Sequence, residues 1–205
     1  MPAAFWLIFK AYYQKSNEFS REHYSFSKFK RDPDVFGILL KGSGQADFVE
    51  VRNSLIIGSP DAPVVITTFL SLYCAPCASF FKELVTLLES RNDIKVNLIF
   101  SVYGDSETQK VINTLYYLYE SEGTEAACNF LSRWYSISKV SRKALYSDKP
   151  IPEKFNLAQM VGEQNGRLFE NAKISGTPTI FVNGYKYPTH YKFSDLFYYI
   201  DDLKN

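Results

Sequence analysis

In this chain two cysteines lie at the junction of a strand pattern and a helix pattern, which restricts the folds that the chain can adopt. Residues 63–72 read PVVITTFLSL, an apolar and β-branched run that is typical of a central strand buried on both faces. Residues 76–90 carry Phe and Leu at helical spacing, with charged side chains between them. Cys74 and Cys77 therefore lie where the predicted strand meets the predicted helix. Pro76 fits the first helical turn because its missing N–H would have no partner there.

Patterns on either side extend this unit to a βαβ motif. Residues 94–103 alternate apolar and polar side chains, which predicts a second strand parallel to the first in one sheet. Residues 48–57 predict an earlier strand, ending at the Gly58-Ser59-Pro60-Asp61 turn signal. Downstream, helical spacing marks residues 106–122, 127–135, 139–146 and 157–169, strand character returns at 179–182 and 185–187 around Asn183-Gly184, and residues 193–200 predict a closing helix.

The composition excludes several classes of protein. Apolar residues make up 46% and charged residues 22% of the chain, proportions typical of a folded globular domain. The formal charge of +1, with no stripe of basic and aromatic residues, gives no reason to expect a nucleic-acid partner. Three cysteines are too few for a disulfide-stapled secreted scaffold or a four-thiolate zinc site. A bridge from Cys74 to Cys77 closes too short a loop to stabilise the fold, so we expect its value to be chemical.

The first 34 residues differ in composition from the rest. Residues 3–9 are apolar but too few to span a bilayer, and they lack the basic leader and small-residue cleavage site of a signal peptide. Residues 10–34 are aromatic and locally basic, and we interpret them as a connecting arm. Two interpretations stay open: a solvated, partly helical leader, or a juxtamembrane segment that follows a transmembrane helix. We accordingly expect either a cytosolic protein or a fragment.

The cysteine pair carries a chemical prediction. Side chains three positions apart at a helix start share one face, with Cβ atoms close to the separation that a disulfide needs. Cys74 meets the positive end of the helix dipole and unpaired backbone N–H groups, which favour its thiolate, so we expect it to be the nucleophile. Cys77 is expected to be more buried and to resolve the mixed disulfide by attacking the sulfur of Cys74. The dipeptide Ala75-Pro76 adds no side-chain cation or hydrogen bond, which disfavours a very strong oxidant.

Three segments, in order, carry a resemblance to a known family. They are GSPDAPVVITTF leading into YCAPC, the helical block, and SGTPTIFVNG at residues 175–184. In these the chain resembles thioredoxin-fold oxidoreductases of the DsbA-like type over residues 50–205. The resemblance implies an α/β, thioredoxin-like fold with an inserted helical domain. Its expected divisions are an arm at 1–47, the first part of the thioredoxin-like domain at 48–104, the helical insert at 105–173 and the second part at 174–205. The arm resembles the linker that follows the membrane bundle in vitamin K epoxide reductase proteins fused to such a domain.

The resemblance also implies site residues. Pro178 would follow a cis peptide bond and face the cysteines, and the backbone of Thr177 would pair with an extended substrate segment beside the nucleophile. Tyr73, directly before the first cysteine, is expected to contact substrate as well. Many thioredoxin-like proteins carry a buried acid six positions before the first cysteine, and Thr68 occupies that place here. The proton acceptor for the resolving thiol is therefore left open between water and a carboxylate such as Glu83.

Other candidate residues have simpler explanations. Cys128 lies among apolar residues and is expected to be a buried, inert thiol. A zinc site from the three cysteines and His190 has weak support, because one C-x-x-C motif without a second paired motif is a poor signal. Four aromatic residues of the helical block are expected to pack between helices, with a role in a substrate groove as the alternative: Tyr116, Tyr119, Trp134 and Tyr135.

Together these features predict thiol-disulfide exchange between the Cys74–Cys77 pair and protein substrates, without a cofactor or a bound metal. The expected location is an oxidising compartment, the periplasm or the outer face of the inner membrane. A membrane vitamin K epoxide reductase-like domain, linked to quinone, is a candidate partner. The alternatives are a non-catalytic peptide-binding or maturation module and a metal chaperone. The direction of exchange, the physiological substrate and the oligomeric state stay open.

Overall fold

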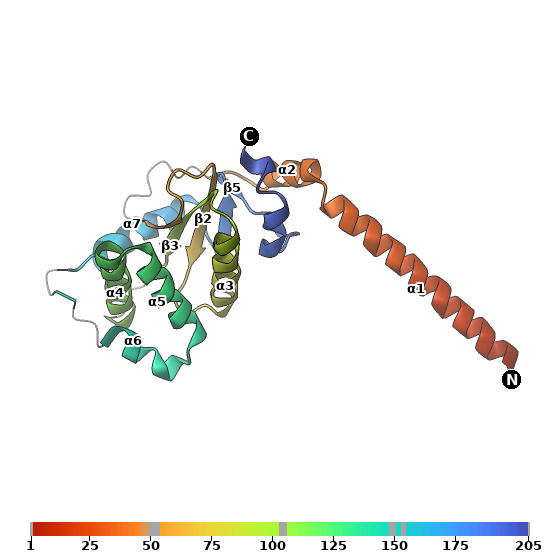
Figure 1. Ribbon diagram of the computed structural model, residues 1–205, viewed down its shortest axis with the longest axis horizontal. Helices are drawn as coiled ribbons and strands as arrows, with labels where there is room; N and C mark the ends of the chain where they lie inside the picture. The colour runs from red at the N-terminus through yellow and green to blue at the C-terminus, as the bar shows by residue number, and fades with distance from the viewer. Residues whose placement is uncertain are drawn as a thin grey trace.

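The described residues form a mixed five-stranded sheet with helices on both faces (Figure 1). The computed structural model describes residues 2–46, 48, 54–102, 106–147, 151–152 and 155–204. The strand order is β1-β3-β2-β4-β5. The strands are β1 (Leu55–Gly58), β2 (Val64–Leu70), β3 (Ile94–Phe100), β4 (Thr179–Val182) and β5 (Tyr185–Lys186).

The helices surround this sheet and extend beyond it. The α-helices are α1 (Pro2–Lys30), α2 (Pro33–Gly42), α3 (Ala75–Ser90), α4 (Ser106–Glu122), α5 (Thr124–Ser136), α6 (Lys143–Ser147) and α7 (Ala158–Asn171). Short 3₁₀ helices are η1 (Lys139–Ser141), η2 (Phe193–Tyr198) and η3 (Asp202–Lys204). The helical block from α4 to α7 lies between β3 and β4 in the chain, as the sequence predicts.

The central unit confirms the predicted βαβ motif. β2 pairs with β3 in parallel, from Val64 opposite Ile94 to Leu70 opposite Phe100, and α3 connects the two strands. β4 pairs antiparallel with β2 and forms the predicted hairpin with β5. The earlier strand is shorter than predicted. β1 begins at Leu55 and runs antiparallel to β3, Phe48 lies outside any strand, and residues 49–53 of the predicted stretch lie outside the described residues.

Each face of the sheet has its own apolar core, because side chains alternate along the strands. On one face, Ile66 and Leu70 of β2 join a large core that also contains Cys77 and Phe81 of α3. On the other face, Phe69, Ile99 and Phe181 form a smaller core, on which α7 packs through residues that include Phe169. The ring of Phe169 meets that of Phe69 edge-on, with centroids 4.9 Å apart. β2 is thus covered on both faces, as its apolar and β-branched run predicts.

Helix α2, which lies in the segment expected to be a linker, contributes to the larger core. The interpretation of this segment as a linker is therefore corrected for α2. Phe36 is buried and stacks on Tyr199 near the C-terminus, with ring centroids 4.0 Å apart and planes 6° apart. Asp32 starts α2 by accepting a hydrogen bond from the N–H of Asp34 at 2.9 Å. The sequence does not indicate the burial of Phe36, because its aromatic partners lie more than 150 positions away along the chain.

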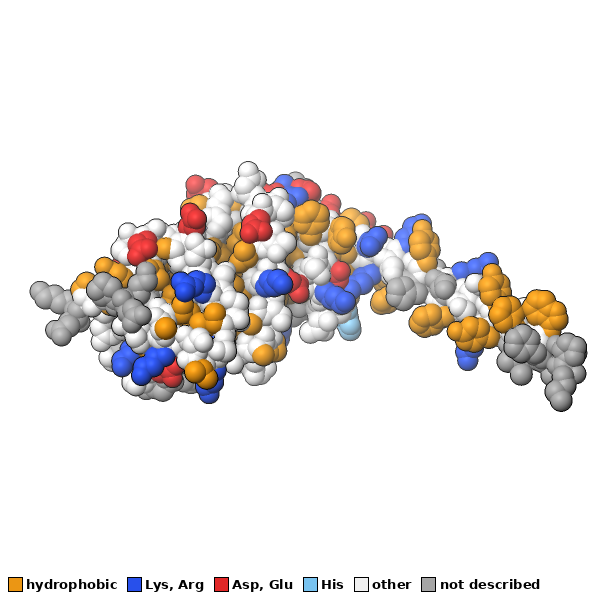
Figure 2. Space-filling view, turned by 60° about the horizontal axis from the view of Figure 1, so that its bottom comes forward, with side chains coloured by type: hydrophobic (Ala, Val, Ile, Leu, Met, Phe, Trp, Pro, Cys, Tyr) orange, Lys and Arg blue, Asp and Glu red, His pale blue; other side chains and the backbone are white. Residues whose placement is uncertain are grey.

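α1 projects from the rest of the molecule as a long helix (Figure 1). Large aromatic side chains, among them Trp6, Tyr12, Phe19 and Phe26, are exposed along it. Figure 2 shows these hydrophobic side chains interspersed with basic ones along the projecting segment. No helix within the described residues combines the length and the apolarity needed to cross a bilayer.

The closing helix predicted for residues 193–200 is a 3₁₀ helix over Phe193–Tyr198. Its backbone bonds join positions three apart, as from the N–H of Tyr199 to the carbonyl of Leu196 at 2.9 Å. Phe193, Leu196 and Tyr199 are buried, and a spacing of three places them on one face of a 3₁₀ helix. An α-helix over residues 193–200 would place Phe197 on the same apolar face as Phe193 and Ile200, whereas the Phe197 side chain is 46% exposed.

Candidate active site

The site forms where β2 meets α3, and Cys74 is the residue at the turn. Cys74 has extended backbone angles (φ −91°, ψ 117°) and caps the N-terminus of α3. Its Sγ accepts a hydrogen bond from the backbone N–H of Cys77 at 3.2 Å. Ala75 and Pro76 are exposed in the first turn and contribute no polar side-chain atom. The sulfur therefore stands at the positive end of the helix, as the sequence predicts.

The two thiols differ sharply in environment. Cys77 is fully buried, and burial together with the hydrogen bond to Cys74 raises the pKa of its thiol to about 12. Cys74 is only half-buried. Burial on its own raises the pKa of the Cys74 thiol, but hydrogen bonds with Cys77 and with the side chain of Thr177 outweigh it, so that the pKa is lowered overall. Both thiols are free in this structure. Cys74 therefore has the more stable thiolate and Cys77 the more protected thiol.

The segment before β4 lies against the cysteines. The Thr177–Pro178 peptide bond is cis, and the thiol of Cys74 lies 3.2 Å from the carbonyl oxygen of Thr177, to which it donates. Hydrogen bonding with Thr177 lowers the pKa of both thiols, against the opposing effect of burial. Thr177 and Pro178 are half-buried, which leaves part of each open to solvent.

The loop between β2 and Cys74 is held by α5. Trp134 donates from Nε1 to the carbonyl of Leu72 at 2.7 Å, and the Tyr135 hydroxyl donates to the carbonyl of Ser71 at 3.1 Å. Tyr73 is 43% exposed beside Cys74, and its ring meets that of Trp134 edge-on. From the sequence, Trp134 and Tyr135 were expected to pack between helices. Their contacts with the cysteine loop could not be inferred, because more than 60 residues separate the partners.

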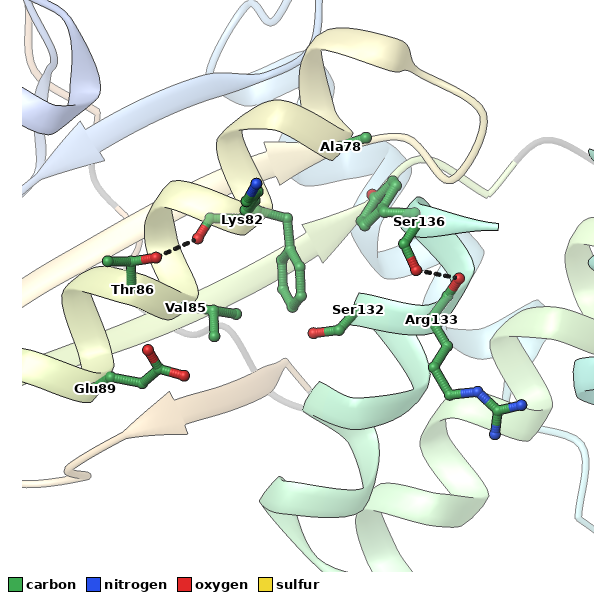
Figure 3. Close-up of a pocket in the computed structure, with 10 residues that line it drawn as sticks. Ala78, Lys82, Val85, Thr86, Glu89, Ser132, Arg133 and Ser136 are labelled. Carbon is green, nitrogen blue, oxygen red and sulfur yellow. Dashed lines mark hydrogen bonds between the residues drawn. The ribbon is translucent and has the colours of Figure 1, made fainter. Parts of the chain in front are cut away.

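A groove runs between α3 and α5, beginning one turn after Cys74. It encloses about 520 Å³. Figure 3 shows Lys82, Val85, Thr86 and Glu89 of α3 on one side and Ser132, Arg133 and Ser136 of α5 on the other. Phe81 and Tyr135 complete an apolar lining with charged groups at its edges. This volume lies in the range of ligand-binding pockets.

Other predicted residues do not reach the cysteines. Glu83 is exposed, lining a different groove with Ser194 and Phe197, and it is absent from the groups that perturb the pKa of Cys77. The proposed carboxylate acceptor is thus not supplied by Glu83, because Glu83 and Cys77 occupy different faces of α3. Thr68 is fully buried, and its Oγ1 has no hydrogen-bond partner among the described residues.

The remaining cysteine and histidine candidates are unremarkable in their surroundings. Cys128 is half-buried, whereas the sequence predicted a buried thiol. Burial, followed by the charge of Glu125, raises the pKa of its thiol to about 11, which favours the protonated form. His190 is exposed. Within the described residues, no cluster of three His, Cys, Asp or Glu side chains could hold a metal ion.

A comparison with protein families decides the classification. The family model described as thioredoxin matches residues 50–202, well over half of the chain. The chain belongs to the thioredoxin family. Its thioredoxin-like region includes every strand of the described sheet, the cysteine pair and the Thr177–Pro178 segment. No curated protein matches the chain.

Solved structures share this thioredoxin-like fold at low sequence identity. The catalytic domain of ScsC from Proteus mirabilis superposes with a TM-score of 0.60 at 18% identity, covering 74% of this chain and 89% of that one. Oxidised BdbD from Bacillus subtilis gives 0.59 at 16%, covering 79% and 97%. The thiol-disulfide exchange protein α-DsbA2 from Wolbachia pipientis gives 0.59 at 15%, covering 90% and 98%. These likenesses establish the fold of this thioredoxin-family chain.

Proposed function

We propose that this protein is a thiol-disulfide oxidoreductase, in which the Cys74–Cys77 pair undergoes thiol-disulfide exchange with protein substrates. The observation that carries the proposal is the asymmetry of the pair. Cys74 Sγ caps α3 and accepts the N–H of Cys77, whereas the thiol of Cys77 is fully buried behind it. A half-buried thiolate can attack a substrate, and a buried thiol three positions along the helix can attack only its neighbour.

In the reducing direction, the Cys74 thiolate attacks one sulfur of a substrate disulfide. A bond forms between Cys74 and the substrate, and the second substrate sulfur leaves as a thiolate that takes up a proton. Cys77 then loses its proton and attacks Cys74 Sγ, forming the Cys74–Cys77 disulfide and releasing the first substrate sulfur. Two electrons pass from the dithiol to the substrate. Oxidation of a substrate dithiol is the same sequence in reverse.

Substrate is proposed to lie along the Thr177–Pro178 segment as an extended chain. The Thr177 carbonyl lies 3.2 Å from Cys74 Sγ, so a peptide that pairs with this backbone would bring its own sulfur next to the nucleophile. Tyr73, the residue before Cys74, is exposed and supplies apolar contact area. These features favour a polypeptide substrate over a small thiol.

A membrane partner of the vitamin K epoxide reductase type, in an oxidising compartment such as the periplasm, is the finer part of the proposal. Its support is α1, where Trp6, Phe9 and Tyr12 are exposed and lie near Lys10 and Lys15 in the sequence. Figure 2 shows hydrophobic and basic side chains together along the projecting segment. Aromatic and basic side chains together favour the interface of an anionic bilayer. Co-sedimentation with vesicles containing phosphatidylglycerol tests this part. Binding that is unchanged when Trp6 and Phe9 are both replaced by serine contradicts it.

Reduction of insulin by dithiothreitol tests the enzymatic proposal, with wild type, Cys74→Ser and Cys77→Ser compared. We expect catalysis by wild type and a rate at the uncatalysed background for Cys74→Ser. Cys77→Ser should accumulate a mixed disulfide that is visible on a non-reducing gel, because the resolving attack is missing. Equal rates for wild type and Cys74→Ser would instead favour the alternative of a non-catalytic peptide-binding module.

A further inference from the structure

The carbonyl groups between the end of β2 and Cys74 accept hydrogen bonds from two other segments, the residue after β3 and helix α5. The carbonyl of Leu70 accepts from the N–H of Ser101 at 2.8 Å, just beyond β3. The next two carbonyls, of Ser71 and Leu72, accept from Tyr135 and Trp134 of α5. The Ser71 carbonyl also accepts from the N–H of Cys74 at 3.3 Å. Two side chains of the helical insert thus hold the turn from which the nucleophile projects.

Resting on the proposed function, we propose that Tyr135 and Trp134 are positioning residues for the dithiol, acting through the Ser71 and Leu72 carbonyls. Neither residue touches substrate in this role. They hold the turn so that Cys74 Sγ stays within hydrogen-bond distance of the N–H of Cys77. Loss of either donor lets the turn move, and the sulfur loses part of the hydrogen bonding that stabilises its thiolate.

Both donors are themselves held in place. Trp134 is fully buried, and the guanidinium of Arg142 lies over its ring at 5.0 Å while Arg142 Nε donates to the Trp134 carbonyl at 3.0 Å. Tyr135 packs its ring against Phe81 of α3, with centroids 5.5 Å apart. Burial, and then the nearby thiols of Cys77 and Cys74, raise the pKa of the Tyr135 hydroxyl well above its ordinary value. The hydroxyl therefore stays protonated and remains a donor.

Tyr135→Phe tests the proposal because it removes one hydroxyl and keeps the ring. The matched control is Tyr119→Phe, which removes a tyrosine hydroxyl that accepts from the N–H of Ile56 at 3.4 Å, away from the cysteines. The readouts are the pH dependence of Cys74 alkylation by iodoacetamide and the equilibrium of the pair with glutathione. Trp134→Phe is the second variant, since it loses the indole N–H but keeps an aromatic ring.

For Tyr135→Phe we expect the midpoint of Cys74 alkylation to rise by about half a pH unit and the glutathione equilibrium to shift about threefold toward the disulfide. Trp134→Phe should shift both in the same direction, and Tyr119→Phe should match wild type. If Tyr135→Phe and Trp134→Phe alkylate with the wild-type midpoint, the proposal is wrong, whatever happens to their thermal stability. Absence of exchange activity in wild type would instead contradict the proposed function itself.

Discussion

Gly58, at the end of β1, shows how a single residue can be required for two reasons at once. Its φ of +82° lies in a region that residues with a Cβ rarely occupy. In addition, a Cβ at this position would collide with the backbone carbonyl oxygen of Ile94 and come within 3.1 Å of Leu88. The turn signal in the sequence indicates the first reason, and only the packing of β1 against the start of β3 reveals the second.

Gly58→Ala should therefore destabilise the protein more than a glycine replacement that only changes backbone preference. Gly44→Ala is the matched control, because Gly44 has a φ of +94° and no heavy atom within 4 Å of the added Cβ. We expect Gly44→Ala to lower the free energy of unfolding by about 1 to 2 kcal/mol and Gly58→Ala by at least about 1 kcal/mol more. Urea denaturation measures both. Equal losses would show that the backbone of Ile94 moves aside without cost.

At the scale of elements, a charged network joins the α3–β3 turn to η3 at the C-terminus. Asp93 Oδ1 accepts from Arg91 Nε at 2.9 Å, and Lys204 Nζ lies 2.6 Å from Asp93 Oδ2. Arg91 also pairs with Asp201 at 2.7 Å. Hydrogen bonding from Arg91 lowers the pKa of the Asp93 carboxyl well below its ordinary value, against an opposing effect of burial, and Lys204 lowers it further.

The sign of this shift gives a pH dependence of stability. A carboxyl whose pKa is lower in the folded than in the unfolded state stabilises the fold above its unfolded pKa of about 4, and this contribution is lost as the pH falls toward the folded pKa. Asp93→Asn should thus cost about 1 kcal/mol near neutral pH, and the difference from wild type should shrink below about pH 4. Thermal unfolding across this pH range measures it. A difference that stays constant down to about pH 2 would contradict the ion-pair assignment.

Predictability also differs from one element to another. The bounds of β2, α3 and β3 were predicted closely. A strand buried on both faces and a helix with one apolar face each produce a pattern that can be recognised within a short stretch of sequence. The closing segment was misassigned as an α-helix, since spacings of three and four are both present among its apolar residues. Contacts with α2 and α3 decide which residues are buried, and Phe193, for example, packs edge-on against Phe80 of α3 at 4.6 Å.

For the molecule as a whole, α2 completes the fold from outside the region that resembles thioredoxin. Phe36 lies between Tyr199, stacked at 4.0 Å, and Tyr191, edge-on at 5.1 Å. The Tyr199 hydroxyl donates to the carbonyl of Lys30 at 2.5 Å, and Lys30 Nζ pairs with Asp195 at 2.7 Å. These contacts fix the point from which α1 projects (Figure 1).

Phe36→Ala in the full chain should therefore destabilise the C-terminal segment together with α2. Removing a fully buried phenylalanine costs about 3 to 5 kcal/mol. The control Ile38→Ala should stay within about 0.5 kcal/mol of wild type, because Ile38 is 71% exposed on the same helix. Urea denaturation gives the energies, and limited proteolysis shows whether α2 detaches. A small loss for Phe36→Ala would mean that the thioredoxin-like region is stable without α2.

From the local pattern alone it follows that a buried strand ends a few residues before Cys74, that a helix begins directly after Cys74, and that Cys77 lies in the first turn of this helix. These are local facts, since strand and helix periodicity and helix capping depend on residues only a few positions apart. The surroundings of the sulfur atoms follow from the tertiary structure, and for the Thr177–Pro178 segment only the family resemblance indicated them in advance. Thr177 reaches Cys74 from 103 positions away, and Tyr135 reaches Ser71 from 64 positions away. Contacts at such separations depend on how the sheet and the helical insert pack, and the spacing of residues along the chain does not predict that packing.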